Sequence, residues 1–291
     1  MLSGKQKEHI KILSDQYKKL LNKKIELLLF DAEIAENVYN SNAIENSTLT
    51  LVETEDILLN IEFSKKLNIR EVFEAKNTTF VNQYVMQSSK KTEITEEFIL
   101  LLHKMLLGNI DEPIAGRFRE GKENVKVFNH VAPRPSEIPS LIEALIEDYL
   151  QDTESHFLEK IARFHCKLEN IHPFNDGNGR LGRALINFSL IKLGLPPIIV
   201  FNSEKHTYYK ALREFDTLKS ADKFEKILFL QLSESLNKRL AYYGSGETIT
   251  LAEFARINSL GIHNLINKAR RQTIGAFRER GVWKILHERN Q

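Results

Sequence analysis

The sequence has little of several features that mark specialised classes of protein. One cysteine, Cys166, among 291 residues excludes an internal disulfide and a zinc site built from several cysteines, and this residue is expected to pack in a helix. No apolar run is long enough to span a bilayer or to form the core of a signal peptide. A net charge of +2 gives no reason to expect the whole protein to adhere to nucleic acid or membranes. We therefore expect a cytoplasmic protein without a membrane partner.

What the sequence does contain is typical of a helical globular protein. Hydrophobic residues make up 42% and charged residues 27% of the chain, and the length suits one large domain with a small appendage, or two domains. Apolar residues recur at helical spacing in most segments, which predicts a mainly helical fold. The predicted helical segments are residues 6–29, 28–39, 57–63, 72–85, 95–107, 139–150, 155–170, 181–190, 203–217 and 224–240.

The densest group of reactive side chains lies in residues 171–183, which read Ile-His-Pro-Phe-Asn-Asp-Gly-Asn-Gly-Arg-Leu-Gly-Arg. His172 is expected to be neutral at cytoplasmic pH, because the reference pKa of histidine is about 6.5, so it can accept a proton from a hydroxyl nucleophile. Gly177 and Gly179 flank Asn178 in a predicted tight turn. Without Cβ atoms on the glycines, successive backbone N–H groups of this turn can converge on an anion.

The residues around the turn complete a predicted phosphate site. The helix that follows would place partial positive charge at its N-terminus, against the turn. Arg180 and Arg183 lie three residues apart on the first helical turn, and each guanidinium can bind phosphate oxygens in a bidentate manner. Asp176 offers a hard oxygen ligand suited to Mg²⁺. A polar loop with solvated charges is the alternative for any one of these residues, but it does not account for the ordered set.

This string resembles the signature of Fic (filamentation induced by cAMP) domain proteins, His-x-Phe-x-[Asp/Glu]-Gly-Asn-Gly-Arg-x-x-Arg, and matches it at every specified position. The resemblance implies an all-α fold of the Fic helical-bundle type, transfer of AMP from ATP to a protein hydroxyl, and dependence on Mg²⁺. Phe174 would be the apolar anchor of the loop. The other implied roles are His172 as the base, Asp176 as the magnesium ligand, residues 177–179 as the anion hole, and Arg180 and Arg183 as phosphate contacts.

A second short motif lies upstream, in Ser41-Asn42-Ala43-Ile44-Glu45-Asn46, after a segment with apolar residues at helical spacing. A glutamate packed near Arg183 would form a charge-assisted pair with it and occupy the place of a terminal phosphate. The motif resembles the Fic inhibitory pattern [Ser/Thr]-x-x-x-Glu-[Gly/Asn], and its position is similar to that in the N-terminal class of inhibited Fic proteins. An ordinary helix end, with Ser41 and Asn46 as polar caps and Glu45 solvated, is the alternative.

Residues 116–130 are the main exception to the helical pattern and predict a short β-hairpin. Residues 117–119 would form one arm and residues 124–128 the other. In the Fic resemblance this hairpin is the flap, which docks a segment of the target protein by main-chain pairing. A surface hairpin that bridges two helices is the alternative.

Two tyrosines and four histidines are the remaining candidates for site residues. Tyr208 and Tyr209 lie in a stretch that resembles the adenine-side wall of Fic proteins, where an aromatic ring can stack on the purine, and core packing is the alternative. Four histidines have no mutual spacing that suits a metal site, so we expect them to be hydrogen-bonded or on the surface: His103, His130, His165 and His206.

The chain changes character after the Gly-Ser-Gly sequence at residues 244–246. Residues 248–257, with Thr250 as a candidate N-cap, and residues 263–272 predict two helices around a glycine turn, as in a helix-turn-helix. From Glu247 onward eight Lys and Arg stand against four Glu, a difference of +4. The order resembles winged-helix modules, with residues 281–285 as a winglike strand. Contacts with DNA phosphates are predicted for Lys268, Arg270 and Arg271.

Together these patterns predict an N-terminal helical region (residues 1–90) that carries the inhibitory helix, a Fic catalytic core (91–243) and a winged-helix-like module (247–291). The predicted function is a protein adenylyltransferase that transfers AMP from ATP to a Ser, Thr or Tyr hydroxyl of a target protein and is inhibited by Glu45. Removal of AMP from a modified protein is one alternative. A DNA-binding regulator whose core senses nucleotide is another, and the tail could instead serve homodimerisation or target docking.

Overall fold

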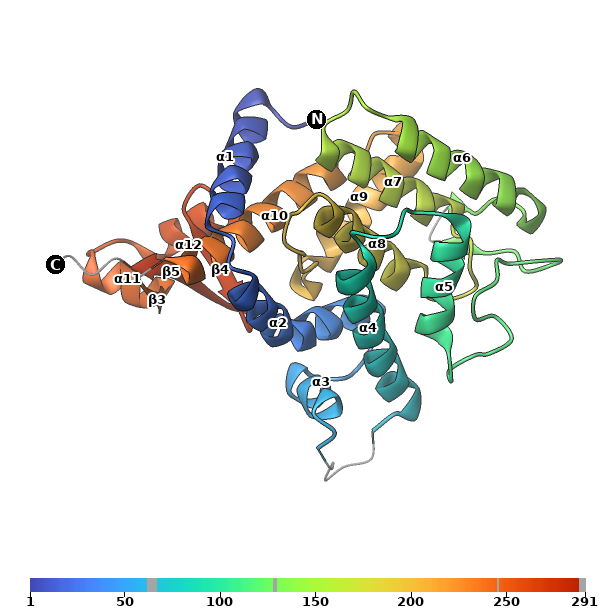
Figure 1. The fold of residues 1–291 in the computed structure, drawn as a ribbon, viewed down its shortest axis with the longest axis horizontal. Coiled ribbons are helices and arrows are strands. Elements are labelled where there is room, and N and C mark those ends of the chain that lie inside the picture. The colour runs from blue at the N-terminus through green and yellow to red at the C-terminus, as the bar shows by residue number, and fades with distance from the viewer. Residues whose placement is uncertain (62–66, 128–129, 245, 288–291) are drawn as a thin grey trace. The chain divides into compact units, whose positions relative to one another are not determined.

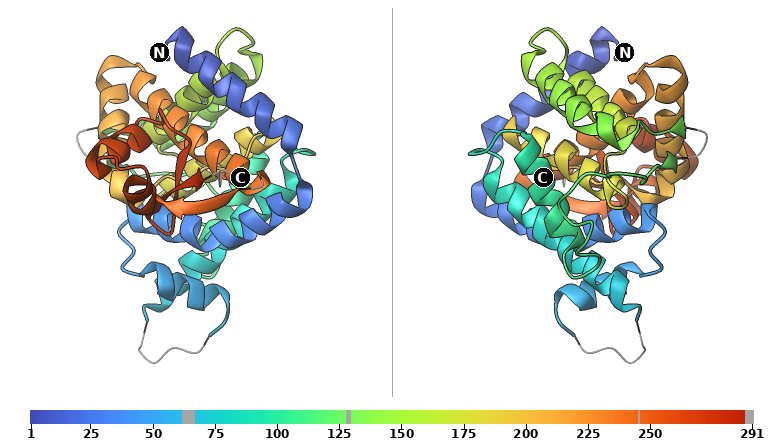
Figure 2. Two further views of the ribbon diagram at one scale, coloured as in Figure 1. Left: turned by 90° about the vertical axis from the view of Figure 1, so that its left-hand side faces the viewer. Right: turned by 90° about the vertical axis from the view of Figure 1, so that its right-hand side faces the viewer.

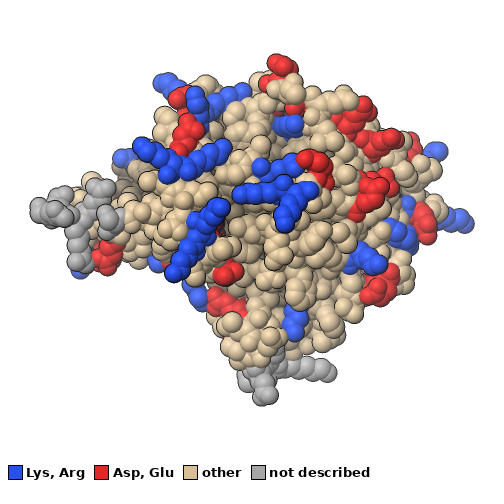
Figure 3. Space-filling view, in the orientation of Figure 1, with Lys and Arg blue, Asp and Glu red and all other residues tan. Residues whose placement is uncertain are grey.

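The computed structural model of the protein describes residues 1–61, 67–127, 130–244 and 246–287. The chain is mainly helical (Figure 1), which confirms the predicted fold class. It divides into two compact units, one made of Met1 and residues 34–193 and 199–225, the other of residues 2–33, 194–198 and 226–291. These units cut across the three predicted regions, whose boundaries stay a prediction. Side chains of both charge signs occur on the face in Figure 3, in line with the small net charge.

The first unit is a helical bundle around α8 (Asn178–Lys192). Residues 180–191 of α8 are all buried, as expected for a helix with apolar residues on every side. Its neighbours in Figure 1 are α4 (Ile69–Ser88), α5 (Glu96–Leu107) and α7 (Phe157–Ile171). The remaining helices of this unit are α3 (Leu51–Leu58), α6 (Ile138–Gln151), α9 (Lys205–Leu218) and the short 3₁₀ helices at Pro135–Glu137 and Asn202–Glu204.

Side-chain caps encoded in the sequence fix where several helices begin. The Thr95 hydroxyl accepts a hydrogen bond from the Phe98 N–H at 3.1 Å at the start of α5. Thr50 and Glu53 form a reciprocal capping box at the start of α3. The apolar faces of α5, α7 and α8 pack into one core, which includes Ile99, Leu102, Leu168, Leu181, Leu185 and Phe188. The predicted packing of Cys166 in a helix is confirmed, since it is buried in α7 with a free thiol.

The hairpin of the first unit differs from the prediction. Its strands are β1 (Lys126–Val127) and β2 (His130–Val131), with Lys126 opposite Val131, while residues 117–119 form no strand. The reason is that the Arg119 backbone N–H bonds the Pro173 carbonyl at 2.9 Å, so this segment joins another part of the fold. The predicted strand residue Phe128 lies outside the described residues.

The second unit contains α1 (Gly4–Leu20) and a three-stranded antiparallel sheet in the order β3-β5-β4. Figure 2 shows this sheet with two short helices in the orange and red part of the chain. The elements are β3 (Glu247–Thr250), α11 (Leu251–Ile257), α12 (Ile262–Arg270), β4 (Ala276–Glu279) and β5 (Val282–His287). Two longer helices, α2 (Lys23–Ile44) and α10 (Asp222–Tyr243), contribute residues to both units.

Two helix boundaries in this unit were predicted wrongly. Residues 248–250 belong to β3, because Thr-Ile-Thr is rich in β-branched residues and pairs with β5, and the helix starts only after the N-cap Thr250. The single helix predicted for residues 6–29 is broken between α1 and α2. There the Asn22 side chain accepts hydrogen bonds from the N–H groups of Lys24 and Ile25 at 3.0 and 3.3 Å and starts a new helix. Within the described residues, no helix combines the length and apolar character needed to cross a bilayer.

Candidate active site

Hydrogen bonds and ring packing hold the loop between α7 and α8 in place. Asn178 bonds both backbone groups of Phe174, accepting from its N–H at 3.0 Å and donating to its carbonyl at 2.8 Å. The Phe174 ring is fully buried and stacks on His103 with 3.7 Å between ring centroids. The side chain of Asn178, predicted to bind nucleotide, is therefore occupied in shaping the loop.

His103 supports the same loop as a neutral side chain. Its Nδ1 accepts a hydrogen bond from the Gly116 N–H at 3.0 Å, which leaves Nε2 to donate to the Asp176 carbonyl at 3.0 Å. Burial lowers the pKa of His103 to about 4, so the imidazole is uncharged at neutral pH. The expectation that this histidine is hydrogen-bonded, and not a metal ligand, agrees with both contacts.

His172 ends α7 in a left-handed backbone conformation, with φ of 49°. Burial and then the charge of Arg119 lower the pKa of His172 to about 4, which keeps the ring neutral at neutral pH. Its Nδ1 is buried and has no hydrogen-bond partner among the residues that the structure describes. A neutral imidazole can accept a proton from a hydroxyl group.

The N-terminus of α8 faces the carboxylate of Glu45. Gly177 is the N-cap, with φ of 80°, a backbone conformation that glycine adopts readily. A Cβ atom built on Gly179 would collide with Oε1 of Glu45, so the carboxylate lies directly over this glycine. The first turn of a helix favours an anion, because its N–H groups are unpaired and carry partial positive charge. Glu45 supplies that anion here.

Arg183 binds the same carboxylate from α8. Its Nη2 donates to Glu45 Oε1 at 2.9 Å and to the Ser41 carbonyl at 2.8 Å, and its Nε donates to the Ser41 hydroxyl at 3.0 Å. The guanidinium is 5% exposed, so these hydrogen bonds replace water that it has lost. The structure thus brings together Glu45 and Arg183, which were predicted to interact, and adds Ser41 as a further partner of Arg183.

Contacts with α4 and α9 hold the end of α2 that carries Glu45. Thr78 in α4 donates to the Asn42 side chain at 3.2 Å. Tyr209 in α9 donates its hydroxyl to the Ile44 carbonyl at 3.2 Å, and Lys205 donates to the side chain of Asn46 at 2.8 Å. Asn46 itself adopts a left-handed conformation, with φ of 71°, that ends the turn after the helix. Glu45 is therefore placed by tertiary contacts as well as by its helix.

Asp176 and Arg180 bind each other. Arg180 is 3% exposed and lies 3.1 Å from Asp176 and 3.3 Å from Glu74 of α4, and Arg70 of α4 also pairs with Asp176. Burial opposes ionisation of Asp176, but the neighbouring arginines and the Gly177 N–H outweigh it and lower the pKa of the carboxyl group. Arg180, predicted as a second phosphate contact, is thus paired with two carboxylates.

The two tyrosines differ in placement. Tyr208 is 1% exposed, and its hydroxyl lies 2.8 Å from His165 Nε2 and 3.5 Å from Arg183 Nη1. A ring enclosed in this way cannot stack on a purine, so the alternative of core packing describes Tyr208. Tyr209 is half-buried beside the end of α2.

A buried carboxyl group next to this network was not predicted from the sequence. Glu169 lies three residues before His172 in α7, and its Oε1 is buried without a partner among the described residues. Burial, followed by the charge of Glu45, raises the pKa of Glu169 to about 8, so this side chain is mostly protonated at neutral pH. The helical pattern placed Glu169 on a helix but carried no signal of its burial.

We predict that Glu169 makes stability fall as the pH rises. Its folded-state pKa of about 8 exceeds the ordinary value of 4.5, so its contribution is full below about pH 4.5 and is lost as the pH rises toward 8. Glu169→Gln should remove this loss, which is at most about 1.4 kcal/mol per pH unit. Thermal denaturation at several pH values, with the exposed Glu143→Gln as control, measures the difference. Parallel curves for Glu169→Gln and the wild type would contradict the prediction.

Comparisons with known proteins agree with this geometry. Residues 93–190 match the family model described as Fic/DOC family. The chain is 36% identical over 182 residues to protein adenylyltransferase Fic of Drosophila willistoni and 33% identical over 191 residues to that of Nematostella vectensis. These alignments cover 61% and 62% of this chain but 36% and 42% of the relatives, so the chain spans less than half of their length.

Solved structures are similar to this chain over a larger share of its length. A Fic domain containing signaling protein from Bacteroides thetaiotaomicron has a TM-score of 0.74 at 27% identity, over 81% of this chain and 96% of its own. Fic-1 of C. elegans has a TM-score of 0.71 at 27% identity, over 81% and 70%. A Fic family protein from Desulfovibrio desulfuricans shares the fold over 100% of this chain and 98% of its own, with a TM-score of 0.68 at 21% identity. Residues 93–190 of this chain thus match the Fic/DOC family model, and the fold around them is similar to that of solved Fic structures at 27% identity.

Proposed function

We propose that this protein is an adenylyltransferase that moves AMP from ATP to a Ser, Thr or Tyr hydroxyl of a target protein. The observation that carries the proposal is a neutral histidine, His172, five residues before the anion-binding N-terminus of α8, where Arg183 also lies. The relatives named protein adenylyltransferase support it. The cytoplasm, where ATP is present, is the location that we propose.

In the proposed reaction the target hydroxyl gives its proton to His172 while its oxygen bonds the α-phosphorus of ATP. The bond from that phosphorus to the bridging oxygen breaks, and pyrophosphate leaves. The N–H groups at the start of α8 stabilise the charge on the phosphate oxygens, and the nearby charge of Arg180 stabilises the leaving group. One donor of Arg180, Nε, has no partner in the described part of the chain.

Asp176 is the residue that we assign to Mg²⁺. Its side chain is 36% exposed, and the lowered pKa keeps it ionised. Among the described residues no cluster of three metal-binding side chains exists. A single accessible carboxylate fits a cation that takes one or two protein ligands and fills its shell with water and substrate phosphates. When bound, the ion would neutralise phosphate charge, while Arg70 and Arg180 orient the carboxylate.

We further propose that Glu45 inhibits the protein, as in the N-terminal class of inhibited Fic proteins. Its carboxylate occupies Arg183 and the N-terminus of α8, both of which ATP phosphates would use. Two anions cannot share these donors, so ATP in the productive position requires Glu45 to leave. Ser41 would keep part of the Arg183 hydrogen bonding during the exchange.

The hairpin of β1 and β2 is the proposed docking site for the target protein. Each strand has two residues, and an added strand from the target would extend the pair by main-chain hydrogen bonds. Target choice would then depend partly on backbone geometry.

A second activity is proposed for the tail, as a winged-helix-like module that binds DNA. The basic side chains of α12 and of the turn after it, Lys268, Arg270 and Arg271, are all exposed. Exposed cations on a second helix suit contact with DNA phosphates. Homodimerisation through this module stays an alternative prediction.

Glu45→Gly should raise ATP affinity about tenfold and increase AMP transfer, because it frees Arg183 and the α8 N-terminus. Calorimetry measures binding, and intact mass after incubation with ATP and Mg²⁺ measures self-modification by AMP. Glu154→Gly, which removes an exposed carboxylate between α6 and α7, should behave as wild type. ATP binding and transfer unchanged in Glu45→Gly would refute the inhibitory role. Removal of AMP from a modified target by the wild type, without transfer by either protein, would favour the reverse reaction.

His172→Ala, placed in the Glu45→Gly background, should lower the rate of AMP transfer by roughly 10²- to 10⁴-fold, the usual range for a general base. The dissociation constant for ATP should stay nearly the same, because the phosphate contacts are retained. Intact mass and calorimetry again supply the two readouts. Loss of ATP binding would instead indicate that His172 maintains the structure of the loop.

The full chain should shift a random DNA duplex in a gel at low salt, and the shift should weaken as salt rises. Replacing Lys268, Arg270 and Arg271 together by Ala should weaken binding at every sequence tested, with a shallower salt dependence. Absence of a shift at low salt would exclude the DNA-binding role.

A further inference from the structure

Arg119 makes an unusual set of contacts with the catalytic loop. Its side chain is 2% exposed, and its Nε donates to the His172 carbonyl at 2.8 Å. Its Nη2 lies 3.4 Å from the Ile171 carbonyl, and its backbone N–H donates to the Pro173 carbonyl at 2.9 Å. One arginine therefore binds three consecutive carbonyl groups centred on the proposed base.

The same guanidinium binds both sides of the hairpin. Its Nη1 donates to the Glu123 carbonyl at 2.7 Å, three residues before β1, and its Nη2 donates to the Pro133 carbonyl at 3.1 Å, two residues after β2. A second link runs from β2, where His130 Nε2 lies 2.8 Å from the carbonyl of Asn170 near the end of α7. The hairpin and the catalytic loop thus share a buried cation.

The contact with Arg119 is important because of the backbone conformation of His172. A left-handed conformation, with φ of 49°, is unfavourable for a residue with a Cβ atom and persists only where the surroundings hold it. The Asn178 side chain fixes Phe174, but the carbonyl of His172 itself is held by Arg119. Rotation of this peptide group would redirect the imidazole.

We propose that Arg119 is a positioning residue for the reaction proposed above, holding the His172 backbone in its left-handed conformation and fixing the hairpin to the catalytic loop. The inference rests on the proposed transfer of AMP only for its kinetic consequence. The contact with His172 is a property of the protein without substrate.

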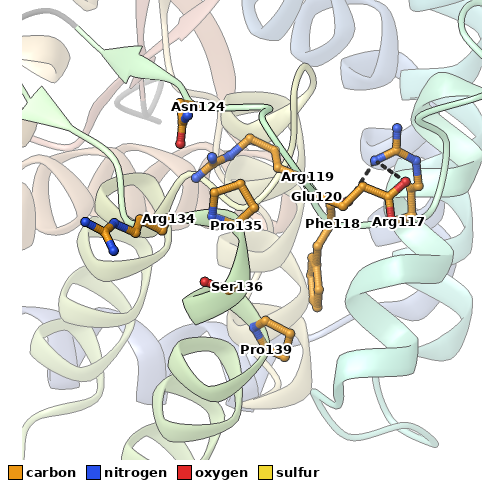
Figure 4. Close-up of a pocket in the computed structure, with 10 residues that line it drawn as sticks. Arg117, Phe118, Arg119, Glu120, Asn124, Arg134, Pro135, Ser136 and Pro139 are labelled. Carbon is orange, nitrogen blue, oxygen red and sulfur yellow. Dashed lines mark hydrogen bonds and ion pairs between the residues drawn. The ribbon is translucent and has the colours of Figure 1, made fainter.

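A pocket adjoins the buried side chain of Arg119. It has a volume of about 570 Å³ and is also lined by Phe118, Arg134 and Pro135, shown in Figure 4. A target segment docked at the hairpin would enter next to the side chain that holds His172. Arg119 is thus shared by the pocket wall and by the contacts that hold the His172 backbone.

The charge of Arg119 supplies a second, independent readout. After burial, it is the largest cause that lowers the pKa of His172, and His130 acts in the same direction. Glu45 and the backbone of Glu169 act in the opposite direction. Removal of the guanidinium should therefore raise the pKa of His172. Loss of a neutral side chain that only fills space would have no such effect on this pKa.

The test compares Arg119→Gln and Arg119→Lys with Arg134→Gln, which removes an exposed arginine from the same pocket. NMR of labelled histidine gives the pKa of His172 in each full-length variant. The kcat for AMP transfer and the KM for ATP are measured in the Glu45→Gly background. Circular dichroism checks that each variant is folded.

Arg119→Gln should raise the pKa of His172 and lower kcat on the order of 10²-fold with an unchanged KM for ATP, since misplacement of a catalytic group by about 1 Å costs that much. Arg119→Lys keeps the charge, so the pKa should stay near the wild-type value. Its kcat should still fall, because a single ammonium group cannot replace the planar guanidinium, which donates to carbonyl groups of both the catalytic loop and the hairpin. Arg134→Gln should change neither the pKa nor the KM for ATP.

An unchanged pKa of His172 together with a kcat within twofold of the parent, in Arg119→Gln, would overturn the proposal. If Arg119→Gln does not fold, Arg119→Lys decides the matter, because a wild-type kcat in that variant would show that the bonding geometry is unnecessary. Absence of transfer by the Glu45→Gly parent would count against the proposed function alone. The shift in the pKa of His172 would still test Arg119 in that case.

Discussion

The site depends on the need of one buried cation, Arg183, for an anion. A guanidinium that is 5% exposed has lost most of its water, and leaving such a charge without its partner costs about 3–5 kcal/mol. Ser41 supplies neutral acceptors, whereas Glu45 is the one carboxylate in the described part of the chain that forms an ion pair with Arg183. The proposed exchange of Glu45 for a phosphate would keep an anion beside Arg183, because one anion would replace another on the same donors. Loss of Glu45 without a replacement would be unfavourable.

The surroundings of Arg183 reinforce that constraint. The N-terminus of α8 favours an anion at the same place, and Glu169, close by, is kept mostly protonated by burial and by the charge of Glu45. The site thus holds the Glu45 carboxylate against Arg183, beside a mostly protonated Glu169. His172 and His103 add no charge, since burial lowers the pKa of each to about 4.

Predictions from the sequence pattern were correct for elements that depend on residues close together in the chain. Most of the helices were found, since apolar spacing and caps such as Thr95 and Thr250 act within a few residues. Strands were predicted poorly at residues 117–119 and 248–250. A strand is fixed by its partner, and β3 pairs with β5 more than thirty residues later, which no local window detects. In residues 117–119, Arg119 instead forms hydrogen bonds with the catalytic loop.

The sequence by itself determined the chemical groups of the site. It supplied His172, the glycine turn, Asp176 and the arginines in one string, and it also contained Ser41 and Glu45. Only the tertiary structure decided which of these groups meet, because Glu45 and Arg183 are 138 residues apart. It also enclosed Tyr208 in the core, paired Arg180 with Glu74, and placed Arg119 on the backbone of His172. Burial and charge pairing depend on neighbours from distant segments, so they follow from packing and not from local sequence.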